Sequence, residues 1–66
     1  MKTKGVINEF NGRYGTINMN NEIVDFSAKD ISNNEKVQVG DLVEFRLEVK
    51  FPNIKIARNI KTLVII

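Results

Sequence analysis

The sequence has no cysteine and no histidine among its 66 residues. These absences exclude disulfide bonds, thiol nucleophiles and zinc sites with the usual ligand types, and they remove the commonest general base. We therefore expect no cofactor and no metal. We also predict that the protein is not an enzyme, because paired acids such as Glu9 and Asp25 on a small domain without a pocket are usually surface residues.

Long apolar runs are also missing. The longest run is the terminal Leu63-Val64-Ile65-Ile66, which is far too short to cross a bilayer. The segment Met1–Lys4 leads directly into an alternating strand pattern, so we expect no signal peptide, no membrane partner and a soluble, cytoplasmic protein. The apolar run at Leu63 to Ile66 either completes the core or pairs with a protein partner or another copy of the chain.

The length and composition predict one domain spanning residues 1–66. Hydrophobic residues make up 42% of the chain, which supports one small core and argues against disorder. The net charge is only +2, so any binding of nucleic acid depends on how the cations are clustered.

The alternation of apolar and polar residues predicts strands and hairpins throughout. Asn11-Gly12 and Asn20-Asn21 predict two-residue turns, because both central residues of such a turn need a positive φ. Ser27–Ile31 is predicted as a single helical turn, since it is too short for a stable helix. The five expected strands are Lys2–Phe10, Tyr14–Met19, Glu22–Ser27, Leu42–Val49 and Lys55–Ile65.

The last two strands are expected to have one inward and one outward face. In the fourth, Val43, Phe45, Leu47 and Val49 alternate with charged residues. In the fifth, one face is expected to carry Ile54, Ile56, Arg58 and Ile60, and the other Lys55, Ala57, Asn59 and Lys61. Five short strands predict an all-β fold, a small five-stranded antiparallel β-barrel, because closure removes the strand edges and gives every strand one core.

Several short motifs are similar in order and spacing to a known family. They are Gly5-Val6, Phe10-Asn11, Tyr14-Gly15-Thr16-Ile17, Val24-Asp25-Phe26-Ser27-Ala28, Gly40-Asp41-x-Val43-x-Phe45 and Ala57-x-Asn59-Ile60. On these residues the chain resembles a cold-shock domain, the small member of the OB-fold class, over nearly its whole length. The resemblance implies an OB-fold barrel that binds single-stranded nucleic acid by stacking bases on exposed aromatic side chains.

The departures from that family pattern fall on the stacking positions. Glu9 stands where the family has Trp, Thr16 and Ile23 replace Phe, and Asp25 replaces His. A stacked base contributes about 1–3 kcal/mol, so these replacements predict weakened binding. They also support an alternative, in which the barrel is a protein-interaction or structural module that has lost nucleic-acid binding.

The leading hypothesis is sequence-tolerant binding of single-stranded RNA or DNA. Aromatic side chains would stack on bases, and the basic residues would meet phosphates. Phe10 and Phe26 have a second interpretation as core residues, and Phe51 with Pro52 lies in the loop between the last two strands. The candidate binding residues are Lys4, Phe10, Arg13, Tyr14, Phe26, Lys29, Phe51 and Lys55.

Overall fold

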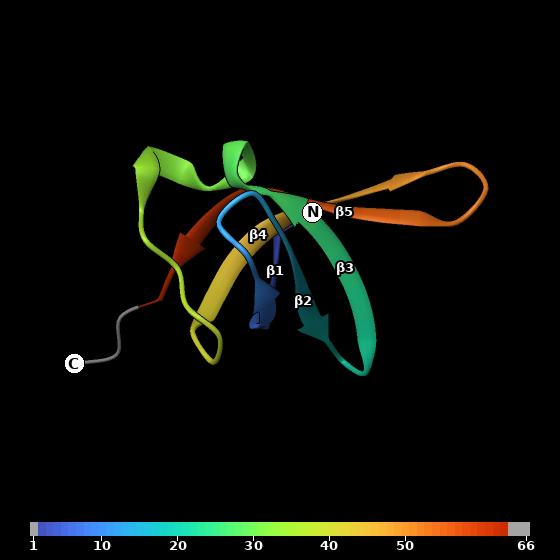
Figure 1. Ribbon diagram of the computed structural model, residues 1–66. Coiled ribbons are helices and arrows are strands. Elements are labelled where there is room, and N and C mark those ends of the chain that lie inside the picture. Colours follow the sequence, from blue (N-terminus) through green and yellow to red (C-terminus); the bar gives the residue numbers. More distant parts are fainter. Residues whose placement is uncertain (1, 64–66) are drawn as a thin grey trace.

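The structure is a computed structural model that describes residues 2–63, and it is a closed barrel of five strands (Figure 1). Two short 3₁₀ turns, η1 (Ala28–Asp30) and η2 (Ser32–Asn34), follow the third strand. The predicted helical turn at Ser27–Ile31 is confirmed as η1. No helix in residues 2–63 has the length and apolar character needed to cross a membrane. The strands are β1 (Lys2–Phe10), β2 (Tyr14–Met19), β3 (Glu22–Ser27), β4 (Leu42–Lys50) and β5 (Ile54–Thr62).

The strand order around the barrel is β1-β2-β3-β5-β4, and β4 closes on β1. This arrangement confirms the all-β barrel of OB-fold type. One detail of the prediction was wrong, because the sheet is not wholly antiparallel. β3 and β5 run parallel and pair at Asp25 and Ile56, since a barrel with an odd number of strands cannot alternate direction all the way round.

The two hairpin turns differ in how well the sequence predicted them. Asn20 and Asn21 have φ values of 50° and 67°, which confirms the predicted turn between β2 and β3. The connection before β2 is a three-residue loop, 11–13, rather than the predicted two-residue turn. Gly12 supplies a φ of 97°, whereas Asn11 contributes its side chain, whose Oδ1 accepts hydrogen bonds from the N–H groups of Arg13 and Tyr14.

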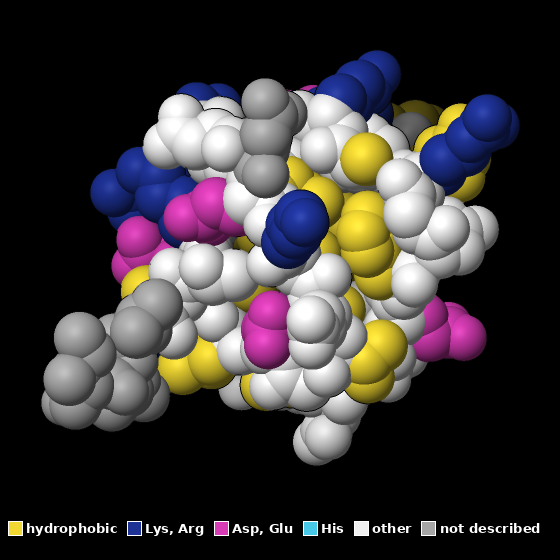
Figure 2. All heavy atoms as spheres, turned by 60° about the vertical axis from the view of Figure 1, so that its left-hand side comes forward, with side chains coloured by type: hydrophobic (Ala, Val, Ile, Leu, Met, Phe, Trp, Pro, Cys, Tyr) yellow, Lys and Arg dark blue, Asp and Glu magenta, His cyan; other side chains and the backbone are white. Residues whose placement is uncertain are grey.

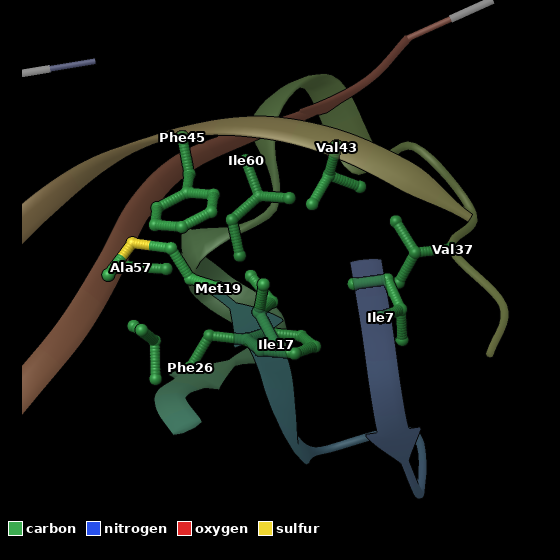
Figure 3. Packing of buried hydrophobic residues seen from close by; sticks show 10 residues of the cluster. Ile7, Ile17, Met19, Phe26, Val37, Val43, Phe45, Ala57 and Ile60 are labelled. Atoms are coloured by element: carbon green, nitrogen blue, oxygen red, sulfur yellow. The ribbon is translucent and has the colours of Figure 1, made fainter. Parts of the chain in front are cut away.

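Inward side chains of all five strands fill the barrel with one apolar core (Figure 3). The predicted faces of β2 and β3 are confirmed, because Ile17, Met19 and Val24 are buried. Phe26 also belongs to the core. The buried apolar residues are Ile7, Ile17, Met19, Val24, Phe26, Val37, Val43, Phe45, Ala57 and Ile60.

A bulge in β5 overturns the predicted strict alternation of that strand. Glu44 pairs with Lys61 but Arg46 pairs with Arg58, so Phe45 faces two residues of β5 instead of one. Asn59 takes a φ of 53° at this point. The extra residue reverses the side-chain phase, which buries Ala57 and Ile60 together, although the alternation predicted them on opposite faces.

The ends of β4 and β5 also differ from the prediction. β4 continues to Lys50, one residue beyond the expected end, and β5 ends at Thr62 rather than Ile65. Residues 64–66, part of the predicted interaction tail, lie outside the described range. Leu63 is described, and its N–H donates to the carbonyl of Leu42 at 2.9 Å.

Candidate nucleic-acid interface

Tyr14 opens β2, and its side chain is 67% exposed. Two hydrogen bonds hold the backbone at the start of β2. Asn11 Oδ1 accepts from the Tyr14 N–H at 2.8 Å, and the Ala28 N–H donates to the carbonyl of Arg13 at 2.7 Å. The loop before β2 and the start of η1 therefore hold the backbone at Tyr14, from which the exposed ring projects.

A shallow hollow of about 490 Å³ lies beside Tyr14, between β2, β3, β5 and η1. Arg13 and Lys29 stand at its rim, and neither forms a salt bridge within the described chain. Asp25 contributes a carboxylate and Ile56 an apolar side chain to the same hollow. The hollow thus combines an aromatic ring, cations and an apolar floor, the groups that contact single-stranded nucleic acid.

Arg58 of β5 lines the same hollow and is held by two acids. Its Nη1 lies 2.7 Å from Asp30 Oδ1, and its Nε lies 3.4 Å from Glu48 Oε2. Asp30 Oδ2 in turn accepts from the Ser27 N–H at 3.0 Å and from the Ser27 hydroxyl at 3.1 Å. Asp30 therefore links η1 to β5 and orients the Arg58 guanidinium along one wall.

These contacts shift the pKa values of both partners. Burial by itself raises the pKa of Asp30, but hydrogen bonds from the Ser27 N–H, Arg58 and the Ser27 hydroxyl outweigh it. The pKa of Asp30 is consequently lowered, so this carboxylate stays ionised at neutral pH. The hydrogen bond to Asp30, with that to Glu48, raises the pKa of Arg58 further above its ordinary value.

A second hollow adjoins the first, and Tyr14 and Asp25 line both. Its other lining residues include Glu9, Thr16 and Phe10. The Thr16 hydroxyl accepts a hydrogen bond from Asn8 Nδ2 at 3.2 Å, so Thr16 adds a polar contact to this hollow. Glu9 and Asp25 make this second hollow acidic, which disfavours phosphate.

The structure brings Arg13, Tyr14 and Lys29 together around one hollow. Phe26 also lines this hollow, but only 3% of it is exposed and its ring is part of the core, so base stacking on Phe26 stays a prediction that its burial disfavours. Phe10 is partly buried and stacks on Phe26, with 5.4 Å between the ring centroids and 26° between the planes. The second interpretation of these two phenylalanines, as core residues, describes their position better than base stacking does.

The other predicted binding residues lie elsewhere. Lys4 pairs in register with Glu44 between β1 and β4, and it lines neither hollow. Phe51 is at the tip of the β4–β5 hairpin, where it is 96% exposed. The Lys55 ammonium forms an ion pair with Glu22 of β3, so its charge is already engaged. A binding role for these three residues stays a prediction.

Arg58 is the main residue of the hollow that the sequence did not single out. The parallel pairing of Asp25 with Ile56 places β5 beside β3, and Arg58 therefore reaches the side of η1. The OB-fold strand order places β5 beside β3, and a register for this pair would have placed Arg58 beside η1. Alternation alone gave no reason to prefer Arg58 over the other cations.

Charge is dispersed on the face of the molecule that Figure 2 shows. Figure 2 shows one face on which separate Lys and Arg side chains alternate with acidic and apolar ones, without a continuous basic area. This distribution agrees with the small net charge of +2. Sequence comparison adds no assignment, since the chain matches no family model and no curated protein is significantly similar to it.

Proposed function

We propose that the protein binds single-stranded RNA or DNA weakly and with little sequence preference, through the hollow beside Tyr14. The observation that carries this proposal is the exposed Tyr14 ring with Arg13 and Lys29 at the rim of the same hollow. The barrel order is that of OB-folds, and the cold-shock resemblance of the motifs supports the same function. On this proposal the protein works in the cytoplasm on unpaired strands.

The mechanism is binding without chemistry on the nucleic acid. One base stacks on Tyr14, which contributes about 1–3 kcal/mol and tolerates any base because every base has a π-face. The adjacent phosphates meet Arg13 and Lys29, which form no salt bridge within the described residues. Arg58 adds a third cation in a fixed orientation, although Asp30 and Glu48 balance its charge.

Intrinsic fluorescence tests the proposal directly, because Tyr14 is the only tyrosine and the chain has no tryptophan. Titration with unlabelled oligonucleotides at low salt should quench the tyrosine signal as a base stacks on the ring. Anisotropy of labelled oligo-dT and mixed-sequence RNA should show the same midpoint. Tyr14→Ala should weaken binding by about 1–3 kcal/mol, roughly 5- to 150-fold.

Lys61→Ala is the matched control, since Lys61 is exposed on β5 but lines neither hollow. It should lower affinity much less than Arg13→Ala or Lys29→Ala does. Unchanged tyrosine fluorescence at saturating oligonucleotide, or equal affinity of Tyr14→Ala and the unsubstituted protein, would refute binding at this hollow.

A second candidate function is a protein-interaction barrel. The observation that favours it is the pair of acids in the hollows, since Asp25 lines both and Glu9 lines the second. These carboxylates repel phosphate but are suited to a basic peptide. Absence of any oligonucleotide signal at low salt, together with tyrosine quenching by a Lys/Arg-rich peptide, would favour this candidate over the first.

A further inference from the structure

The β4–β5 hairpin extends beyond the barrel as an arm, which we define as residues 48–55 (Figure 1). The arm carries exposed apolar side chains because it continues the inward-facing row of β4, residues 43, 45, 47 and 49. Val43 and Phe45 are buried and Leu47 is partly buried, but Val49, the next in the row, is 59% exposed. The row thus continues past the end of the core, and Val49 and Phe51 have no core beneath them.

One edge of the arm has no strand beside it in the described part of the chain. The pairing of β1 with β4 begins at Lys2 and Arg46, so the backbone of Glu48, Val49 and Lys50 has no neighbour on that side. On the other side these residues pair with β5. A two-stranded ribbon is marginal in water, and an exposed edge is a template for a further strand.

The sequence at this edge is complementary to itself. Leu47-Glu48-Val49-Lys50-Phe51 reads apolar, acidic, apolar, basic, apolar, which is symmetric about Val49 with opposite charges on its two sides. Glu48 and Lys50 share one face, with 3.8 Å between Oε1 and Nζ. Antiparallel pairing of this segment with itself about Val49 sets each Glu48 opposite Lys50 of the other copy.

We propose that two copies of this chain associate through these arms, β4 edge to β4 edge, around a two-fold axis at Val49. The arrangement is isologous, since both copies use the same surface. It places Val49 against Val49 and Phe51 against Leu47 of the second copy, which covers the apolar row. Pro52 has no N–H group and ends the pairing beyond Phe51.

The arm is small, so the association is weak. Stable interfaces bury about 1,200–2,000 Å² in total, whereas a few paired residues and one apolar row bury less. Sedimentation velocity between about 10 µM and 1 mM, without nucleic acid, should show a mass that rises from monomer toward dimer with concentration. A monomer mass throughout this range would overturn the proposal.

A charge-reversal experiment tests the register. Glu48→Lys leaves two lysines at positions 48 and 50, and Lys50→Glu leaves two glutamates. Each variant alone places like charges opposite each other and should dimerise about tenfold more weakly at low salt. An equimolar mixture pairs the two-lysine arm with the two-glutamate arm and should associate at least as well as the unsubstituted protein. Failure of the mixture to recover association would contradict this register.

A cysteine cross-link tests the two-fold axis itself, since the chain contains no other cysteine. Directly opposed residues of antiparallel strands have Cα atoms about 4.5–5.5 Å apart, which suits a disulfide. Val49→Cys should therefore form a disulfide-linked dimer under mild oxidation. Val39→Cys is the control, because Val39 is similarly exposed but lies in the loop before β4. Equal cross-linking of both variants would show random collision instead of the proposed dimer.

Glu48 of the arm contacts the nucleic-acid hollow through Arg58. Val49 lines neither hollow and Tyr14 lies outside residues 48–55, so variants at these two positions test the two proposals separately. Val49→Asp should abolish concentration-dependent association and leave tyrosine quenching by oligonucleotides unchanged. Tyr14→Ala, which removes the only tyrosine, should leave concentration-dependent association unchanged and weaken oligonucleotide binding as measured by anisotropy. Loss of both properties in the Val49→Asp variant, with the fold retained by circular dichroism, would mean that the surfaces had been wrongly separated.

Discussion

In the sheet, Gly15 of β2 pairs with Phe10 of β1 on one side and with Phe26 of β3 on the other. The rings of these two phenylalanines stack on each other. A Cβ atom at Gly15 would overlap the carbonyl oxygen of Glu9 and lie 2.5 Å from Cζ of Phe26. Both neighbours are fixed, since one is strand backbone and the other is a core ring. The residue is therefore small for packing reasons.

We predict that Gly15→Ala lowers the free energy of unfolding by about 2–3 kcal/mol, the cost of forcing extra volume into a packed site. Urea denaturation followed by circular dichroism measures this loss. Gly12→Ala is the control, because its Cβ would meet nothing within 4 Å and only its φ of 97° is unfavourable. It should cost about 1 kcal/mol, and equal losses for both variants would disprove the packing argument.

At the scale of elements, η1 is held to β5 by Asp30, which is buried and ion-paired with Arg58. The pKa of Asp30 is lowered in the folded state, so the unfolded chain binds more protons in the range between the two pKa values. The stabilisation from Asp30 is therefore fully present above about pH 4 and is lost as the pH falls through the folded-state pKa.

We expect Asp30→Asn to lower the free energy of unfolding at pH 7 by about 1–3 kcal/mol, allowing for the partial exposure of Arg58. The difference between the two proteins should shrink as the pH is lowered from 5 to about 2, as urea denaturation at several pH values can show. Asp41→Asn is the control, because it removes the charge of a carboxylate that accepts a solvent-exposed hydrogen bond from the Gln38 N–H. A difference independent of pH would contradict the role given to the Asp30 charge.

The arm shows how one element can have two environments along its length. Its inward row is buried at Val43 and exposed at Val49, although the alternation is the same at both positions. The pattern predicted the strand and its faces but could not show where the core ends. The core ends along β4 near the point where β1 stops pairing with it, at Lys2 and Arg46. The register between these two strands sets that point.

At the scale of the whole molecule, ten basic and eight acidic residues leave a net charge of only +2. Binding of nucleic acid then depends on local cations rather than on a general field. With Arg13 and Lys29 as the contacts, a plot of log affinity against log salt should have a slope of about −1.4, from ~0.7 per phosphate contact, because Arg58 is already paired with Asp30 and Glu48.

Asp25→Asn removes a carboxylate that lines both hollows and should raise affinity about threefold at low salt, with little effect at high salt. Anisotropy titrations at several salt concentrations measure both quantities. A slope near zero, or no gain from Asp25→Asn, would mean that phosphates do not approach this hollow.

Much of the fold could be predicted from the sequence because its determinants are local. Alternation located four of the five strand starts to the residue, and Asn20-Asn21 supplied the positive φ values of its turn. The same alternation placed Tyr14 outward and Ile17 inward. These features follow from the two-residue period of a strand and from steric limits on φ, which act between neighbouring residues.

Tertiary structure decided the remaining features, because they arise where distant segments meet. The bulge at Asn59 fits β5 to Phe45 of β4, and it places Ile60 in the core against the strand's own alternation. Barrel closure buries Phe26 and brings Arg58 to Asp30, 28 residues away in the chain. The candidate site therefore combines Tyr14 with basic and acidic side chains from β3, η1 and β5. This combination depends on the register between β3 and β5, which the pattern of one strand does not contain.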